Sequence, residues 1–396
     1  MSLTALVTAS LLVAPPPQPP MPDEIRAAIA DSIPKLLATQ ESYREKGDSA
    51  PDGEAAAVLA EWPYQGVYRV GGRIPYGYRV GGTSIVAQAL LESEGYADDA
   101  KRRDAVARAC AFVTSAIDEP LMSPDPAVYK GGYDVRGWGH CYGLRFLVAL
   151  ERAKAIPAGQ EAAVAKAIAF YLSALQATEI PRVGGWAYAR NPGIENPCAS
   201  SPFMTAPTVL ALLEAERAGH AIDRAVLDRA VAALEAARTE SGFVDYATTG
   251  RSRDRPDQIP GAIGRMVATE TALFQCGRSN VDRIAFALDR FIEHWGALEA
   301  RRQKNGTHEP PYNVAPYYFF YGFHHALAAA DLLPAARRDA YRAKVVAILF
   351  TVRDANGTWN DRVFPRSANF GTAMTISALA APWRAPSVER PRPRDA

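Results

Sequence analysis

The sequence predicts an all-α fold in which six helical hairpins close into a ring, an (α/α)6 toroid around a central funnel. Three observations lead to this prediction. A turn with an aromatic residue recurs along the chain, each period has the pattern of two helices, and one helix of each pair has almost no polar face. A long internal period decides the architecture, because it is the signature of a repeat fold.

The recurring turn carries glycine or proline before an aromatic residue. The six aromatic positions are Tyr78, Tyr133, Trp186, Phe243, Tyr312 and Trp359. They are 55, 53, 57, 69 and 47 residues apart, and an insertion near residues 300–311 accounts for the long step and the short one after it. This period exceeds the roughly 34 to 47 residues of tetratricopeptide and HEAT repeats, so those folds are not expected.

The N-terminal segment 1–22 is expected to lie outside the ring, as a signal peptide or a disordered leader. It has an apolar run, Leu3–Ala14, of the length found in secretory signals, but no basic residue before it, and Pro15 follows unfavourably. Secretion or export to the periplasm is the favoured interpretation, and a cytoplasmic protein stays possible. The ring is expected to span residues 23–382. The Pro- and Arg-rich segment 383–396 is expected to be a disordered tail.

The helices of the outer layer are predicted from apolar stripes. Residues 164–175 and 284–295 place apolar side chains at i, i+4, i+7, i+8 and i+11, which form one face of a helix, and residues 227–234 repeat part of this pattern. A helix with a single apolar face packs on one side and exposes the other.

The helices of the inner layer are apolar nearly all round and should be buried on most sides. They are predicted to begin near Thr83, Gly137, Ser201, Gly261, Ala315 and Phe370. The hairpins could stack linearly or close into a ring. We favour the ring, because closure removes the need for polar terminal caps and gathers the six inner helices around one funnel.

Composition excludes several classes of protein. The 44 Lys and Arg residues nearly balance the 43 Asp and Glu residues, so a net charge of +1 provides no general attraction for nucleic acid. The apolar runs are too short to span a bilayer as helices, so no integral membrane segment is expected. Four distant cysteines, Cys110, Cys141, Cys198 and Cys276, do not form a disulfide framework.

The turns at residues 184–188 (GGWAY) and 356–360 (NGTWN), with their spacing, resemble the repeats of squalene–hopene cyclases and protein prenyltransferase β subunits. The resemblance extends over residues 60–382. It implies a toroid of the terpenoid cyclase type, with a largely apolar, isoprenoid-like ligand in the funnel.

The chain departs from both activities of this group. The Asp-x-Asp-Asp run that protonates the substrate in the cyclases is absent, and Asn196 stands where the prenyltransferase zinc site has an acidic ligand before Cys198. We therefore expect no metal and no cofactor, and the resemblance leaves open whether the protein is an enzyme.

The turns before the inner helices should meet at one mouth of the ring, where helix N-termini favour anions or polarised oxygens. Asp134 and His140 are the candidate catalytic pair there, since a carboxylate that orients a histidine makes a general base. The alternative is structural, with Asp134 as a helix cap or ion-pair partner of Arg136.

Nine further residues are candidate ligand contacts near the mouth or along the inner helices. They are Tyr78, Arg136, Trp138, Cys141, Tyr188, Arg265, Glu270, Tyr317 and His324. Aromatic residues on one helix face, such as Tyr317 ahead of His324, could line a site for a cation or a polyene. Each has a structural alternative: core packing for the aromatic residues and Cys141, and an internal ion pair for Arg265 and Glu270.

Three functions remain open. The first is an enzyme or binding protein for an apolar small molecule in the funnel. The second is a non-catalytic exported toroid that binds a protein or polymer at its mouth, and the third is a carbohydrate-active toroid. The funnel lining distinguishes them: continuous aromatic residues favour a lipid, facing carboxylates favour a sugar, and a filled funnel favours a scaffold.

Overall fold

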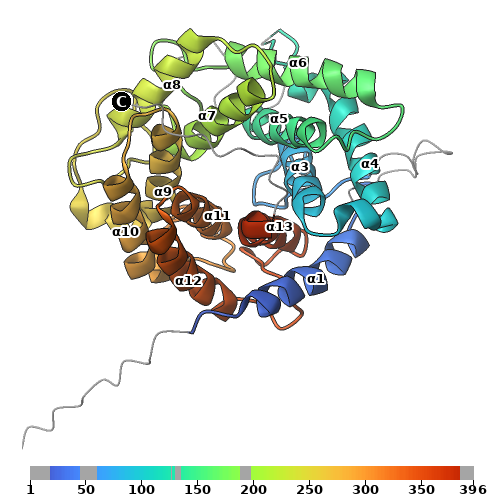
Figure 1. Cartoon of the computed structure of the whole chain (residues 1–396). Coiled ribbons are helices and arrows are strands. Elements are labelled where there is room, and N and C mark those ends of the chain that lie inside the picture. The colour runs from blue at the N-terminus through green and yellow to red at the C-terminus, as the bar shows by residue number, and fades with distance from the viewer. Residues whose placement is uncertain (1–17, 45–59, 126, 130–134, 188–197, 384–396) are drawn as a thin grey trace, which may run out of the picture.

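The helices form two concentric layers around one centre (Figure 1). The computed structural model describes residues 18–44, 60–125, 127–129, 135–187 and 198–383. The outer layer contains α1 (Pro22–Ala38), α4 (Ala100–Ser115), α6 (Glu161–Ala177), α8 (Arg224–Ala237), α10 (Val281–Glu299) and α12 (Ala335–Thr351). The inner layer contains α3 (Tyr76–Glu92), α5 (Arg136–Arg152), α7 (Pro202–Arg217), α9 (Ile259–Gln275), α11 (Tyr318–Asp331) and α13 (Ser367–Ala380).

The two layers differ in burial as their sequences predict. In α10 the buried side chains follow one stripe that includes Ile284, Leu288 and Phe291, whereas α9 is buried at almost every position from Ile259 to Leu273. The described residues hold only isolated β-bridges besides helices and turns. The prediction of an all-α toroid is therefore confirmed.

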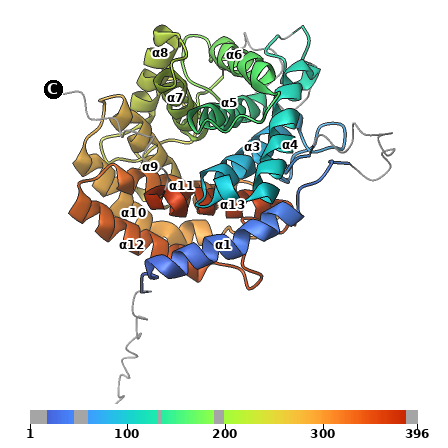
Figure 2. The same cartoon turned by 45° about the vertical axis from the view of Figure 1, so that its right-hand side comes forward.

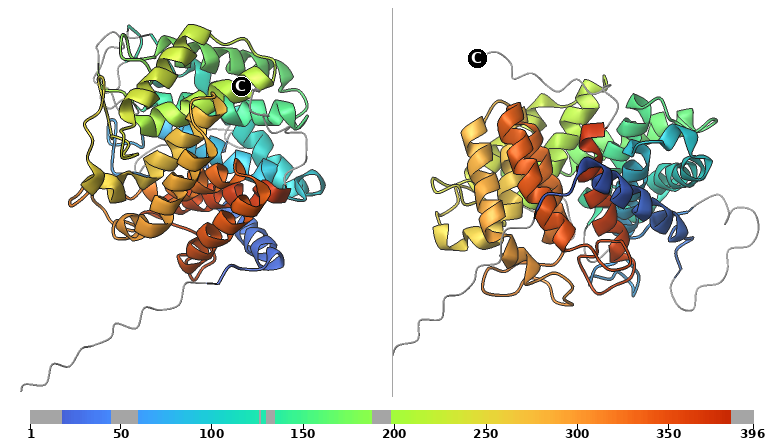
Figure 3. Two further views of the ribbon diagram at one scale, coloured as in Figure 1. Left: turned by 60° about the vertical axis from the view of Figure 1, so that its left-hand side comes forward. Right: turned by 60° about the horizontal axis from the view of Figure 1, so that its bottom comes forward.

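The ring closes between the two ends of the chain. Each inner helix packs against its two inner neighbours, and α13 packs against both α11 and α3. Helix α1 lies beside α13 (Figures 1 and 2), where the Ser32 hydroxyl donates to the Gly357 carbonyl at 2.9 Å. Arg366 also pairs with Glu41, with nitrogen–oxygen distances of 2.6 and 2.7 Å. Figure 3 shows the ring from two other sides, with the outer helices as its wall.

Three tryptophans connect an outer helix to the inner helix that follows it. The indole N–H groups of Trp62, Trp186 and Trp359 donate to the carbonyls of Leu36, Leu175 and Leu349, each two residues before the end of an outer helix. Their backbone N–H groups donate to the hydroxyls of Thr83, Thr205 and Thr372 in α3, α7 and α13. All three side chains are completely buried, so each anchors one hairpin.

The turn before α7 shows why glycine precedes the tryptophan. Gly184 and Gly185 have positive φ angles of 80° and 71°, which disfavour other residues. A Cβ atom on Gly185 would also lie 2.7 Å from the Thr205 hydroxyl, the group that accepts the Trp186 N–H. The Gly-Trp turn is thus required by the packing of the hairpin.

The first repeat differs from the prediction. Helix α3 begins at Tyr76 rather than near Thr83, whereas the other inner helices begin within three residues of the predicted starts. The reason is that Tyr78 lies inside α3, and the anchoring aromatic residue of this repeat is Trp62.

Within the described residues, no helix has the length and apolarity that a membrane span requires.

Candidate functional site

The centre of the ring has two different halves. The half near the starts of the inner helices is filled with aromatic side chains. Tyr64 is central to one group, with ring centroids 5.4 Å from Tyr78, 5.6 Å from Trp138 and 4.9 Å from Phe370. All four residues are buried, so their rings occupy the space that a ligand would need.

A second aromatic group fills the opposite side of this half. Phe203 of α7 packs on three tyrosines at the start of α11, with centroids 5.2 Å from Tyr317, 5.0 Å from Tyr318 and 4.3 Å from Tyr321. The Tyr317 hydroxyl also lies 2.9 Å from Nε2 of His308.

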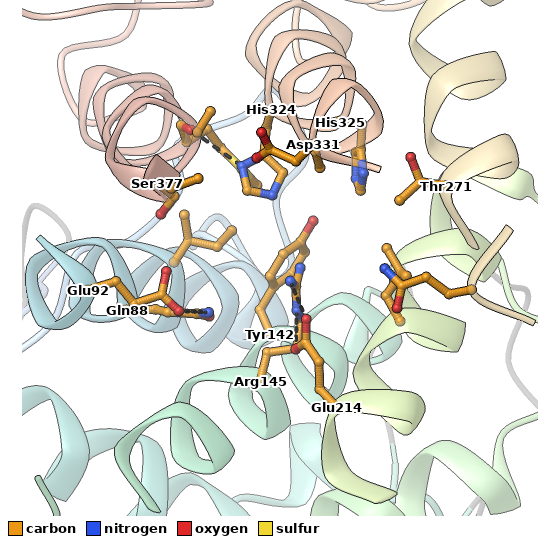
Figure 4. Close-up of a pocket in the computed structure, with 17 residues that line it drawn as sticks. Gln88, Glu92, Tyr142, Arg145, Glu214, Thr271, His324, His325, Asp331 and Ser377 are labelled. Carbon is orange, nitrogen blue, oxygen red and sulfur yellow. Dashed lines mark hydrogen bonds and ion pairs between the residues drawn. The ribbon is translucent and has the colours of Figure 1, made fainter. Parts of the chain in front are cut away.

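The other half contains a central pocket of about 160 Å³, near the C-terminal ends of the inner helices (Figure 4). All six inner helices contribute to its lining. The polar lining residues are Gln88 and Glu92 of α3, Tyr142 and Arg145 of α5, Glu214 of α7, Thr271 and Gln275 of α9, His324, His325 and Asp331 of α11, and Ser377 of α13.

Arg145 and Glu214 form an ion pair across the pocket wall between α5 and α7. The guanidinium donates two hydrogen bonds to the carboxylate, each 2.9 Å long. Burial by itself raises the pKa of Glu214, but the Arg145 guanidinium outweighs burial, so this pKa lies below its ordinary value. Glu214 is therefore a carboxylate that accepts hydrogen bonds rather than an acid that donates a proton.

His325 is a buried histidine at the edge of the pocket. Its ring lies 4.4 Å from that of Tyr321, and 1% of the residue is exposed. Within the part of the chain that the structure describes, neither ring nitrogen has a hydrogen-bond partner. Burial, with His324 and Arg145 nearby, holds the pKa of His325 well below its usual range, so the ring is a neutral donor and acceptor.

The remaining polar groups stand around the same space (Figure 4). Gln88 donates to Glu92 at 2.8 Å, and Asp331 accepts from Arg342 of α12 at 2.8 Å. Burial raises the pKa of the Tyr142 phenol, which keeps its proton. Glu214 and Asp331 of the described lining each pair with an arginine, Arg145 and Arg342, so the pocket is polar and most of its charge is balanced.

The proposed pair Asp134 and His140 does not form a site that the structure describes. Asp134 lies outside the described residues, as does Tyr188. The Nε2 atom of His140 lies 2.8 Å from the Met122 carbonyl, and its ring contacts Phe170 and Tyr171 of the outer helix α6. The expectation that His140 faces the funnel is therefore wrong, because its ring packs between the two helix layers.

The candidate ligand contacts near α3 and α5 have structural partners. Tyr78 and Trp138 belong to the aromatic filling, and Tyr317 belongs to its second group. Arg136 donates to the Ser123 carbonyl and stacks 3.6 Å above the Tyr129 ring. Burial raises the pKa of Cys141 to about 12, which makes this thiol a packing group rather than a nucleophile.

Arg265 and Glu270 on α9 have separate partners and do not form an ion pair with each other. Arg265 donates to the Gly261 carbonyl at 3.2 Å, and its guanidinium lies over the rings of Tyr246 and Tyr318. Glu270 accepts from Arg238 at 3.1 and 3.2 Å. Of the predicted site residues that the structure describes, His324 is the one that lines the central pocket.

The sequence contains a signal for the pocket. Polar residues interrupt the apolar inner helices near their C-terminal ends: Glu92, Arg145, Glu214, Thr271, Asp331 and Ser377. They recur with the period of the repeat, and a polar side chain in a helix buried all round must face a polar space or a partner. Within the described residues, no group of three His, Cys, Asp or Glu side chains could hold a metal ion.

No model of a known protein family matches the chain, and no curated protein matches its sequence. Solved structures do match over nearly the whole chain. The GH76 α-mannanase BT2949 of Bacteroides thetaiotaomicron is 13% identical, with a TM-score of 0.52 over 92% of this chain and 99% of its own. The type II terpene cyclase MstE of Scytonema is 14% identical, with a TM-score of 0.50 over 91% and 98%.

A third similar structure is the unsaturated glucuronyl hydrolase of Bacillus sp. GL1. It is 11% identical, with a TM-score of 0.51 over 90% of this chain and 95% of its own. At these identities the similarity concerns the fold, which terpenoid and carbohydrate enzymes both use. The chain has the α/α-toroid fold that these structures share.

Proposed function

We propose that the central pocket binds a small, neutral, hydroxyl-rich molecule, of which a sugar ring is the leading example. One observation carries the proposal: polar side chains from all six inner helices converge on a single cavity. Hydroxyl groups both donate and accept hydrogen bonds, and the pocket offers donors such as Arg145 and Gln88 beside carboxylate acceptors.

The size of the pocket supports a single ring rather than a long chain. Its 160 Å³ lies below the roughly 300 to 1,000 Å³ of pockets that hold drug-sized ligands. Two aromatic residues that would attract an isoprenoid, Trp138 and Tyr317, are packed against Tyr64, Tyr78 and Phe203 in the opposite half. This arrangement favours the carbohydrate alternative over the apolar ligand that the family resemblance implies.

The similar structures and the charge of the pocket together favour a neutral sugar. Two of the similar structures are carbohydrate enzymes, one named for mannan and one for glucuronyl groups. A negatively charged uronate would have to compete with Glu214 for Arg145, whereas a neutral sugar such as mannose leaves this ion pair intact. We assign binding rather than catalysis, because Arg145 holds Glu214 as a carboxylate that accepts hydrogen bonds.

Ligand-observed NMR on the whole protein tests the proposal. Mannose, glucose, glucuronate and geranylgeraniol would be titrated separately. We expect saturation transfer to a neutral sugar and none to glucuronate or geranylgeraniol. Preferential binding of geranylgeraniol, or of glucuronate, would overturn the proposal.

The filled aromatic half favours one further candidate, a non-catalytic toroid that binds a partner at its mouth. In that case none of the four small molecules should bind.

A further inference from the structure

A larger groove lies beside the central pocket, on the outer side of the inner ring. Its volume is about 660 Å³. One wall is the outer helix α8, and the other consists of the last turns of α7 and α9 together with the residues after α9. The groove is therefore at the same end of the ring as the pocket.

The groove and the pocket share one residue. Gln275, the last residue of α9, lines both of them. Arg217 of α7 donates to the Gln275 side-chain oxygen at 2.8 Å, so a single side-chain hydrogen bond joins α7 to α9 at this boundary. On α7, Glu214 faces the pocket and Arg217 faces the groove, less than one helical turn apart.

The charges of the groove balance. Its lining has three arginines, Arg217, Arg224 and Arg278, and three acids, Glu216, Asp228 and Glu235. Arg224 and Glu216 form an ion pair with each other. A groove without net charge does not attract a polyanion such as nucleic acid or a polyuronate, whereas it provides many donors and acceptors for a neutral polymer.

The described lining of the groove includes one aromatic side chain. Phe274, next to Gln275 on α9, lines the groove and is half-buried. A sugar ring has one or two faces of C–H groups, and an aromatic ring packs well on such a face while the hydroxyl groups point sideways to polar partners.

We infer that the natural ligand is a neutral chain of sugar units, with one unit in the central pocket and the following units in the groove against Phe274. This inference rests on the proposed function. It adds that the ligand is an oligosaccharide and that the path between its units passes Gln275 and Arg217.

Comparing mannose with an α-linked mannotetraose by isothermal titration tests the inference. We expect the tetraose to bind the wild-type protein at least about tenfold more tightly, because it fills the groove as well as the pocket. Phe274→Ala should remove this gain and leave mannose binding unchanged. Phe274→Leu keeps most of the apolar volume but not the flat ring, and should also lose most of the gain.

The control is Phe286→Ala, which changes an exposed phenylalanine of α10 outside the groove and should keep the full gain. If mannose binds but the tetraose binds no more tightly, the inference is overturned and the pocket proposal stands. Unchanged tetraose binding by both Phe274 variants also overturns it. If neither sugar binds, the proposed function fails and the inference with it.

Discussion

At the scale of single residues, the buried histidine His325 differs from the buried polar groups that hold the ring together. His140 is bound to the Met122 carbonyl, and Arg265 donates to the Val244 carbonyl at 3.4 Å, so both connect an inner helix to main chain outside that helix. His325 is equally buried, but within the described residues its nitrogens have no partner. A buried polar group without a partner costs about 1 to 3 kcal/mol, and such a cost is typical of a functional site.

Asp361 gives a prediction for the pH dependence of stability. It is completely buried beside Arg362, and the Tyr64 hydroxyl donates to it at 3.3 Å. Burial raises its pKa from 3.8 to about 7, although Arg362, Tyr64 and Arg302 lower it. Because the folded protein binds this proton more tightly than the unfolded chain, its contribution to the free energy of unfolding falls as the pH rises from about 4 to about 7.

Urea unfolding of the wild type and of Asp361→Asn across this pH range measures the contribution. The stability of the variant relative to the wild type should rise with pH, by at most about 1.4 kcal/mol for each pH unit. A difference between the two proteins that stays constant over the range would contradict the assignment to Asp361.

At the scale of elements, the unit of the fold is a hairpin held by a buried tryptophan. Trp62, Trp186 and Trp359 each bind one carbonyl of an outer helix and one threonine of an inner helix. The turns of Trp186 and Trp359 could be predicted, because glycine before tryptophan recurs with the period of the repeat. Trp62 could not, because no glycine precedes it and the Gly-Tyr pair at residues 77–78 lies inside a helix.

We expect Trp186→Ala to lower the free energy of unfolding by about 3 to 5 kcal/mol, as large aromatic truncations in cores do. Trp186→Phe keeps most of the apolar volume but removes the indole donor, so the Leu175 carbonyl retains the longer bond from the Thr178 hydroxyl at 3.4 Å; the substitution should cost about 0.5 to 1.5 kcal/mol. Denaturant unfolding measures both. Trp295→Ala, at a half-buried position of α10, is the control and should cost less than Trp186→Ala; equal costs would show that Trp186 is not an anchor.

At the scale of the whole molecule, closure of the ring ties the two ends of the chain together. The pairs Ser32–Gly357 and Glu41–Arg366 connect segments more than 300 residues apart. An open repeat protein unravels from its ends, because terminal repeats have one neighbour instead of two. A closed ring has no terminal repeat, so its first and last helices should resist opening as the others do.

Hydrogen exchange followed by mass spectrometry tests ring closure. We predict that the exchange protection factors of the amides in α1 and α13 lie within a few fold of the protection factors in α5 and α7. A steady loss of protection toward both ends of the chain would indicate an open superhelix instead.

The repeat explains why the fold could be predicted and the site could not. Apolar stripes and glycine turns are local, so they reveal the helices, the period and the positions of five inner helices. Which half of the funnel is filled depends on contacts between distant segments, such as Tyr64 with Phe370. The sequence predicts the candidate site at the mouth near the helix starts, but aromatic rings fill that half, and the polar pocket lies at the opposite end.

The binding and stability of His325→Phe, measured together on one protein, test the central pocket most directly. Phenylalanine keeps the ring contact with Tyr321 and removes both ring nitrogens. If those nitrogens bind a ligand, the free energy of unfolding of the variant should be about 1 to 3 kcal/mol higher than that of the wild type. The variant should also no longer bind the neutral sugar that the wild type binds. His140→Phe, which removes a bonded histidine, should instead lower stability and leave binding intact. A His325→Phe protein that is less stable than the wild type and binds the sugar equally well would contradict a binding role for the pocket.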